Sequence, residues 1–570
     1  DPTFGLMKRP GLKFEKQLAT SNLDDAKWFY IHRDGDEKYI GRISAGSPGD
    51  IAIWNATSGV ACTINYDALP WVASTLYKVG DQVLNDSGKI YQCDTQGTSA
   101  GSGGPTGTGT NIADGTSRWD YVSGQVAQNY LTTDRDNYDI LTVQDTSYIT
   151  NKASIITAQA APTHTPNKTG TVTLHTVKYS TKYEVTINGN STANYVTRNS
   201  EDTSVAWDDA DQILSATDIL TQLETHIGTL NTTHSLGLTI TRLESTIELS
   251  SATAFTLTVN DDQGNNHLSS FQEQVTNISR LPFQSVEGRL VKVVNTTAAE
   301  SSYWSKFTAE DGTSGDGNWG ESKAPDVSPG LTASTMPHEL LNTTDNVFLF
   351  RQVNWRGRLV GDIETNSDPS FVGKNIEQAF FHNNRLGFLT ADKVSMSQSG
   401  DINNFFFTTA LTTTDSDPID ISCASTRPAK LHGVIPTAQG LILFSQNQQF
   451  IMFSDSEILT PASAVIRGIS NYEMDTKIDP VDVGTDINFV SKTPSYTRVF
   501  GVQTRGSQDS PLIHDVGKVV SEWIPDTVTA LIASPQNSLI ALYGVTSNLM
   551  YLYKTYAVGG KNLMQSWFKW

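Results

Sequence analysis

The chain has 570 residues, of which 38% are hydrophobic and 18% charged, and its net charge is −20. This length is too great for one hydrophobic core, so we expect three to four domains and exclude a disordered or membrane-like chain. The acidic balance argues against a protein that grips DNA phosphates; it fits either plain solubility or a wall past which DNA slides.

The N-terminal segment, 1–70, is predicted to be β. Two runs of apolar residues, 27–32 and 38–43, flank the Arg-Asp-Gly-Asp sequence at 33–36, which is typical of a hairpin turn. Further strands are predicted at 50–54, 60–64, 139–143 and 147–150. We expect 1–70 and 124–160 to supply blades to one β-propeller, with other material inserted between them.

The first insert covers 71–123 and is predicted to be a small β domain. It is rich in Gly, Thr and Ser between Thr95 and Gly115. It also gathers the aromatic residues Trp71, Tyr77, Tyr91, Trp119 and Tyr121.

The second insert, 161–365, is predicted to be an α+β unit followed by β structure. Apolar residues at helical spacing predict a helix over 208–227, with Asp208 and Asp209 at its start and Gly228 at its end. Strands are predicted at 172–177, 183–187, 238–241, 246–249, 289–294 and 302–307, and a glycine-rich loop at 310–320.

The C-terminal segment, 366–570, repeats a strand, break, strand pattern about every 50 residues. The paired runs lie at 384–390 with 394–397, 440–445 with 449–454, 487–491 with 497–502, and 538–543 with 549–553. Such a repeat is typical of a β-propeller, because one blade cannot bury its own faces. We therefore expect a mainly β protein: a β-propeller platform interrupted by a small β insert and by an α+β and β region.

Several stretches resemble the tail nozzle proteins (tail tubular protein B) of short-tailed phages. They occur in family order and cover most of the chain outside the first insert. They lie at 6–11, 31–34, 335–340, 368–373, 380–389, 417–420, 523–526 and 565–570. The sequences Arg-Leu-Gly-Phe-Leu and Pro-Ser-Phe-Val-Gly within them are the most specific. The chain starts at Asp1 without a methionine, and the family continues beyond the point matching Trp570, so we expect a piece of a longer protein.

This resemblance implies a homo-hexameric tube at the distal end of the phage tail, assembled in the host cytoplasm. It implies as partners a ring-shaped tail adaptor protein, a tail fibre protein and the genomic DNA, which would pass through an acidic channel without sequence-specific binding. The tube would retain the DNA and then conduct it into the host during ejection, and the protein would not be an enzyme.

The first insert has a resemblance of its own, to the small carbohydrate-binding modules of chitinases. It is carried by Trp71 and by the stretches 77–83, 90–93 and 114–121. In such modules exposed aromatic rings stack on sugar faces, which makes the five insert aromatics candidate contacts for a host surface glycan. The alternative is that these rings form the core of a very small domain.

Sequence patterns that suggest catalysis lack the context that catalysis needs. The G-x-S-x-G pattern at 97–101 has no flanking strand and helix, and G-x-G-x-x-G at 315–320 is followed by prolines. The carboxylates Asp415, Asp417 and Asp420 suit a turn between blades. Cys62, Cys93 and Cys423 form no zinc or disulfide pattern, so we expect reduced, buried thiols and neither metal nor cofactor.

Two functions from other classes stay open. A glycan-binding adhesin or a polysaccharide depolymerase of the tail would suit the carbohydrate-module resemblance. A lone propeller that serves as an interaction platform would need no symmetry axis.

Overall fold

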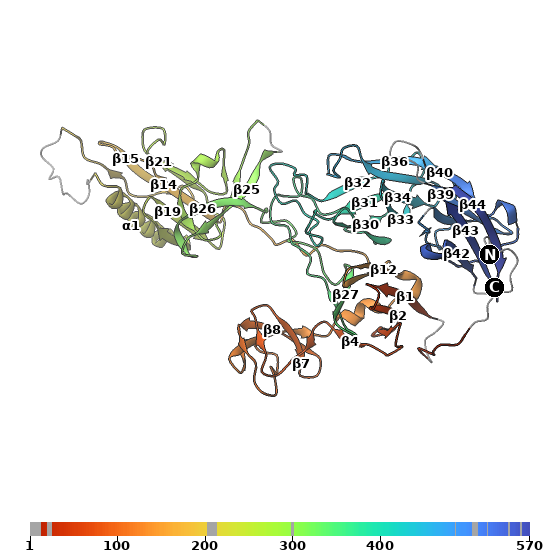
Figure 1. Cartoon of the computed structure of the whole chain (residues 1–570). Coiled ribbons are helices and arrows are strands. Elements are labelled where there is room, and N and C mark those ends of the chain that lie inside the picture. The colour runs from red at the N-terminus through yellow and green to blue at the C-terminus, as the bar shows by residue number, and fades with distance from the viewer. Residues whose placement is uncertain are drawn as a thin grey trace.

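The structure is a computed structural model, which describes residues 13–19, 25–201, 214–297, 301–484, 486–503, 511–520, 522–544, 548–558 and 561–570. It is mainly β, as the sequence predicts, and its strands form many separate sheets (Figure 1). None of the helices in these ranges is long and apolar enough to cross a membrane.

The N-terminal part of the chain contributes to two sheets. The first is β1 (Ala26–His32), β2 (Lys38–Ser44) and β3 (Asp50–Asn55), in that order. The second sheet has the order β12 (Tyr138–Val143), β13 (Thr146–Asn151), β27 (His338–Thr344), β28 (Val347–Gln352) and β4 (Thr63–Tyr66). The predicted hairpin is confirmed by β1 and β2, which pair antiparallel from Ala26 with Ser44 to His32 with Lys38.

The C-terminal part forms four consecutive four-stranded antiparallel sheets. The third sheet has β29 (Gln378–His382), β30 (Arg385–Thr390), β31 (Lys393–Met396) and β32 (Ile419–Ser422), and the fourth has β33 (Leu431–Thr437), β34 (Gly440–Ser445), β35 (Gln449–Ser454) and β36 (Ala464–Ser470). The fifth sheet has β37 (Val481–Asp482), β38 (Ile487–Lys492), β39 (Thr497–Gln503) and β40 (Leu512–Asp515). The sixth has β41 (Ala530–Ser534), β42 (Leu539–Tyr543), β43 (Met550–Val558) and β44 (Lys561–Lys569). The four predicted strand pairs are confirmed as β30 with β31, β34 with β35, β38 with β39, and β42 with β43.

Neighbouring sheets among these six pack on each other, each pair through its own hydrophobic cluster. Tyr39 of the first sheet meets Phe348 of the second edge to face, and Tyr148 of the second shares a cluster with Phe388 of the third. Comparable clusters join the third sheet to the fourth, the fourth to the fifth and the fifth to the sixth. Within the described residues no such cluster combines the first sheet with the last, so the clusters connect the sheets as a row.

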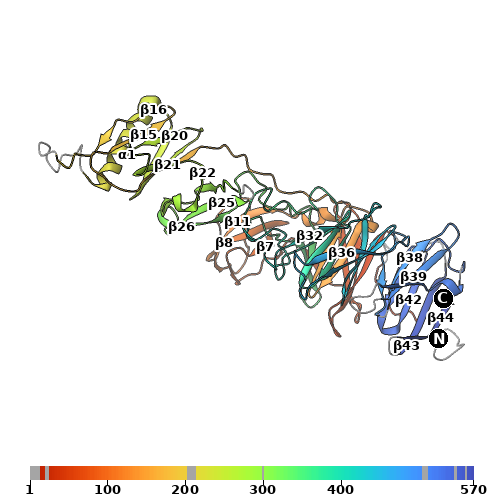
Figure 2. The same ribbon diagram turned by 90° about the horizontal axis from the view of Figure 1, so that it is seen from above.

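An α+β unit lies at one end of the molecule (Figures 1 and 2). Its strands are β14 (Thr169–Leu174), β15 (Lys182–Ile187), β16 (Asn190–Ser191), β17 (Tyr195–Val196), β18 (Leu238–Arg242), β19 (Thr246–Ser251), β20 (Leu257–Asn260) and β21 (Leu268–Phe271). The helix α1 (Ala216–His234) buries Ile219, Leu223 and Ile227 against them.

The predicted bounds of this helix are wrong. It is capped by Ser215, whose hydroxyl accepts from the Asp218 amide, while Asp208 and Asp209 lie outside the described residues. It also runs through Gly228 as far as His234 and ends where Ser235 takes a left-handed conformation. Glycine weakens a helix interior by only about 1 kcal/mol, and the burial of Leu230 in the next turn favours continuing the helix.

A five-stranded sheet follows the α+β unit. Its order is β22 (Gln274–Val275), β24 (Leu290–Val293), β25 (Tyr303–Ala309), β26 (Ser314–Ser322) and β23 (Gln284–Val286). The predicted loop at 310–320 is wrong for most of its length, because β26 begins at Ser314 and pairs first with β23 and then, from Gly317, with β25. Glycine suits this strand, since a Cβ at Gly317 would lie 2.3 Å from the Thr308 carbonyl oxygen and 2.6 Å from the Phe307 ring.

A buried ion pair joins this sheet to the α+β unit. Glu248 of β19 and Arg289, just before β24, are each 4% exposed, with 3.6 Å between Glu248 Oε2 and Arg289 Nε. Ser285 Oγ donates to Glu248 Oε1 at 2.6 Å and Thr171 Oγ1 donates to Oε2 at 2.9 Å. The Arg289 guanidinium also donates to Thr169 Oγ1 and to the Gln272 carbonyl, whereas its buried Nε has no hydrogen-bond partner among the described residues.

The first insert forms a sheet of its own, which projects to one side in Figure 1. Its order is β10 (Ile112–Asp114), β11 (Ser117–Gly124), β8 (Lys89–Thr95), β7 (Gln82–Asn85) and β5 (Leu69–Pro70), and β6 (Leu76–Tyr77) pairs with β9 (Gly97–Thr98) beside it. The Asp67 carboxylate accepts from the amides of Val126 and Ala127, so the chain enters and leaves this sheet at one place. The division of the whole chain at 70, 123, 160 and 365 stays a prediction.

Candidate functional site

The five insert aromatics are brought together, but mostly as a core. Tyr91 and Trp119 are fully buried, and Trp71, Tyr77 and Tyr121 are half-buried against them. The rings of Tyr77 and Trp119 meet edge to face at 4.9 Å, as do those of Tyr91 and Tyr121 at 6.1 Å. Tyr91 and Trp119 therefore have no ring face free for a sugar, a correction for those two residues. Glycan binding by the other three stays a prediction.

Polar bonds fix the half-buried rings in place. Trp71 Nε1 donates to Asp114 Oδ2 at 2.7 Å, and the Tyr77 hydroxyl accepts from the Val72 amide at 2.9 Å. Ser99, from the G-x-S-x-G pattern, is buried and its hydroxyl donates to the Val72 carbonyl. Ser99 therefore has a structural role, because its hydroxyl joins two segments of the insert.

Two carboxylates of the acidic cluster Asp415, Asp417 and Asp420 make structural hydrogen bonds, those of Asp417 and Asp420. Asp417 is fully buried and its carboxylate accepts from the Thr414 and Thr408 amides, whereas Asp420 accepts from the Ser370 amide and hydroxyl. The Arg385 guanidinium closes the loop by donating to the main-chain carbonyls of Ser397, Asp415, Ser416 and Asp417. The cluster does lie at a turn, but the predicted place between two blades is wrong: the turn connects β31 to β32 of one sheet, and Asp420 is in β32.

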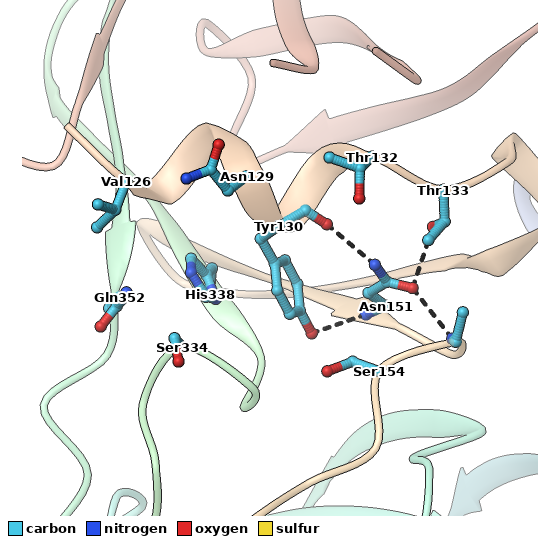
Figure 3. Close-up of a pocket in the computed structure, with 11 residues that line it drawn as sticks. Val126, Asn129, Tyr130, Thr132, Thr133, Asn151, Ser154, Ser334, His338 and Gln352 are labelled. Carbon is cyan, nitrogen blue, oxygen red and sulfur yellow. Dashed lines mark hydrogen bonds between the residues drawn. The ribbon is translucent and has the colours of Figure 1, made fainter. Parts of the chain in front are cut away.

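A polar pocket of about 330 Å³ lies where β13 and β27 meet the 3-10 helix η1 (Ala127–Leu131). Figure 3 shows Tyr130 and His338 side by side, with Asn151 bonded to Tyr130. The pocket is lined by Val126, Asn129, Tyr130, Thr132, Thr133, Asn151, Ala153, Ser154, Ser334, His338 and Gln352. Tyr130, Asn151 and His338 are buried and form its floor.

The floor of the pocket is rigidly built. The rings of Tyr130 and His338 stack at 4.0 Å, and Phe350 stacks with His338 at 5.5 Å. The Tyr130 hydroxyl accepts from the Asn151 amide at 2.9 Å, while Asn151 Nδ2 donates to the Tyr130 carbonyl at 2.9 Å. Because the Met336 carbonyl can only accept, the 2.9 Å contact to His338 Nδ1 puts the proton there and leaves Nε2 as an acceptor.

Burial lowers the pKa of His338 to about 4, so its ring is neutral at physiological pH. The unfolded chain takes up this proton below a pKa of about 6.5 and the folded chain does not, so stability is lost as the pH falls from about 6.5 to 4. We expect a loss of about 2 kcal/mol at pH 5 from this residue. Urea unfolding at pH 7 and pH 5 should show a smaller difference for His338→Gln than for wild type. The exposed His234→Gln is the control, and an equal pH dependence in all three proteins would contradict the expectation.

Sequence reasoning missed this pocket, although His338 lies in one of the family-like stretches. Its residues come from 126–154 and 334–352, which are separated in the sequence by residues 155–333. Each is an ordinary polar residue in its own segment, and only the pairing of β13 with β27 brings them together.

Comparisons with known proteins give one family and one curated relative. The sequence model of the family described as bacteriophage nozzle protein matches residues 1–75 and 103–570, which leaves 76–102 of the first insert outside it. Tail tubular protein gp12 of Escherichia phage T7 is 25% identical over 477 residues, covering 82% of this chain and 58% of that protein. The chain therefore spans less than two thirds of the length of this relative.

Among solved structures the similarities are distant. A putative 6-phosphogluconolactonase from Bacteroides fragilis is 11% identical, with 55% of this chain and 89% of that chain covered and a TM-score of 0.26. The NanB sialidase of Streptococcus pneumoniae is 10% identical, with 83% and 66% covered and a TM-score of 0.26. Superpositions at this level carry no functional argument.

Proposed function

Because the chain belongs to the bacteriophage nozzle protein family, we propose that it forms the distal nozzle of a short phage tail: a hexameric tube, assembled in the host cytoplasm, that retains genomic DNA and conducts it during ejection. Membership makes it a structural protein of the virion tail and not an enzyme. The observation that carries the proposal is the family match along nearly the whole chain. Its proposed partners are a ring-shaped tail adaptor protein and a tail fibre protein.

The charge of the chain supports passage of DNA without adhesion. A net charge of −20 per chain, repeated around an axis, repels the phosphate backbone and disfavours stable protein–DNA contacts. The row of sheets and the unit that carries α1 also make a long molecule (Figure 2), which suits the wall of a tube.

We propose further that the six packed sheets are the blades of a propeller. The outer face of the first sheet exposes Trp28 and Tyr30, and that of the last exposes Ile532 and Tyr543. Apolar sheet faces of this kind are normally covered, and closing the row into a ring would cover both.

Cryo-electron microscopy of the intact particle, averaged about the tail axis, tests the proposal. We expect six-fold density at the tail tip that fits the row of sheets and the α1 unit, with the first and last sheets in contact. Off-axis density would overturn the nozzle assignment. Six-fold density with the row left open would overturn only the propeller.

The first insert is expected to be dispensable for assembly. Its ends meet at Asp67, and 76–102 lies outside the family match, so replacing 71–123 with a short Gly-Ser linker should leave the other sheets folded. We expect the shortened protein to enter particles as wild type does, measured by the protein content of purified tails. If the shortened protein fails to assemble, the prediction is wrong and the insert is needed to form the tube.

A glycan-binding adhesin is the second candidate function, favoured by the half-buried Trp71, Tyr77 and Tyr121 on a projecting sheet. The same linker variant separates the two roles. An adhesin would lose its affinity for host polysaccharide, whereas a nozzle would keep its place in the particle.

A further inference from the structure

The pocket of Figure 3 has features of a binding site that the proposed nozzle role does not use. Its volume of about 330 Å³ lies at the small end of the range of about 300–1,000 Å³ for small-molecule sites. Its floor is fixed by stacked rings and by the paired bonds between Tyr130 and Asn151. A rigid, preformed concavity of this size suits a ligand of about one ring.

The lining selects for a neutral, polar ligand. Among the residues that the structure describes, no Asp, Glu, Lys or Arg lines the pocket, and the His338 ring is neutral because burial lowers its pKa to about 4. A charged ligand would thus lose water without gaining a counter-charge. An apolar ligand would leave hydroxyl and amide groups without hydrogen bonds.

Several of these polar groups have hydrogen-bond donors or acceptors that are not used within the described residues. His338 is 1% exposed and its Nε2 is an acceptor, for which the described part of the chain supplies no donor. The Tyr130 hydroxyl accepts from Asn151 and keeps its own proton to donate. At the rim, the side chains of Asn129, Ser334 and Gln352 likewise make no hydrogen bond to any residue that the structure describes. Donors and acceptors therefore converge from several sides on one small volume.

We propose that this pocket binds a neutral sugar ring, with Asn129, Ser334 and Gln352 at its mouth and Tyr130 and His338 at its base. A sugar ring presents hydroxyls that both donate and accept in several directions, which matches this mixed lining. The ring could be a free monosaccharide or one residue of a surface polysaccharide, and both present the same chemistry. The site is separate from the insert aromatics and does not depend on the nozzle role.

Saturation-transfer difference NMR on the full chain tests the proposal with neutral and charged probes. We expect transfer to at least one of glucose, galactose and N-acetylglucosamine, and much less to glucosamine and glucuronate. Ser334→Trp fills the mouth of the pocket and should abolish transfer. Asn129→Ala removes one amide and should weaken binding about tenfold.

The controls separate loss of the site from loss of the fold. The Asn129 side chain is exposed and makes no hydrogen bond within the described residues, so its alanine variant should fold even if Ser334→Trp does not. Asn318→Ala changes an equally exposed amide on β26 and should bind as wild type does.

Two further arms identify the source of the sugar. If the ligand is part of a cell-surface polysaccharide, oligosaccharides cut from that polysaccharide should bind. If the ligand is a free sugar, only monosaccharides should bind. Either result supports the proposed site. Three results would overturn the proposed sugar site. These are saturation transfer that survives in both pocket variants, binding of charged sugars equal to that of neutral ones, and no transfer to any neutral sugar.

Discussion

Glu248→Gln is expected to destabilise the α+β unit by about 3–5 kcal/mol, the usual cost of leaving one charge of a buried pair without its partner. Glutamine keeps the shape and can accept from one of the two hydroxyls and donate to the other, but it leaves the Arg289 guanidinium without Glu248 as its counter-charge at 4% exposure. Burial also raises the pKa of the Glu248 carboxyl, while Arg289 and the two hydroxyls oppose that rise. The charged form of Glu248 is therefore stabilised mainly by Arg289 and by the hydroxyls of Ser285 and Thr171.

Urea unfolding, with hydrogen exchange at β14 and β19 to localise the effect, measures this loss. The double variant Glu248→Gln with Arg289→Met should be more stable than Glu248→Gln alone, because no charge stays buried. Glu224→Gln breaks a half-exposed pair with Arg242 in the same unit and should cost less than about 1 kcal/mol. A cost for Glu248→Gln as small as that control would show that water reaches the pair.

Arg385→Met is expected to destabilise the third sheet by about 3–5 kcal/mol. The arginine is 1% exposed and donates to four main-chain carbonyls around the loop that holds Asp417. Methionine fills the space but leaves these carbonyls buried and short of donors, at about 1–3 kcal/mol for each one that stays unsatisfied. The loop at 415–417 should then lose its protection in hydrogen exchange.

Two variants sharpen the Arg385 measurement. Arg385→Lys retains the charge without the planar fork, so it should fall between methionine and wild type in urea unfolding. Arg351→Met removes an exposed arginine that pairs with Glu339 across β28 and β27, and should cost less than about 1 kcal/mol. Equal losses for Arg385→Met and Arg351→Met would contradict a clamping role for Arg385.

Strands with alternating or continuous apolar residues could be predicted closely from the sequence. The runs at 440–445 and 449–454 are the strands β34 and β35 without any shift. Strong local preference and the tertiary fold agree there, because both faces of the sheet are buried. The strand predicted at 60–64 instead begins at Thr63 and pairs parallel with β28, a partner almost 300 residues away that no local pattern indicates.

Errors occurred where one residue type can serve two structures. Glycines between 312 and 320 suggest a loop, yet Gly317 is needed because a side chain would strike Thr308 and Phe307 of the neighbouring strand. Among the insert aromatics, type and spacing suit both sugar contact and a core. Only packing reveals that Tyr91 and Trp119 are buried.

The Asp67 clamp has a consequence for how the insert can be replaced. Because its carboxylate holds the amides of Val126 and Ala127, both ends of the inserted sheet are fixed by the parent fold and not by the sheet itself. Any domain whose N- and C-termini lie close together could be inserted at this position without disturbing the neighbouring strands. The insert can therefore be replaced at this position while the rest of the fold is kept.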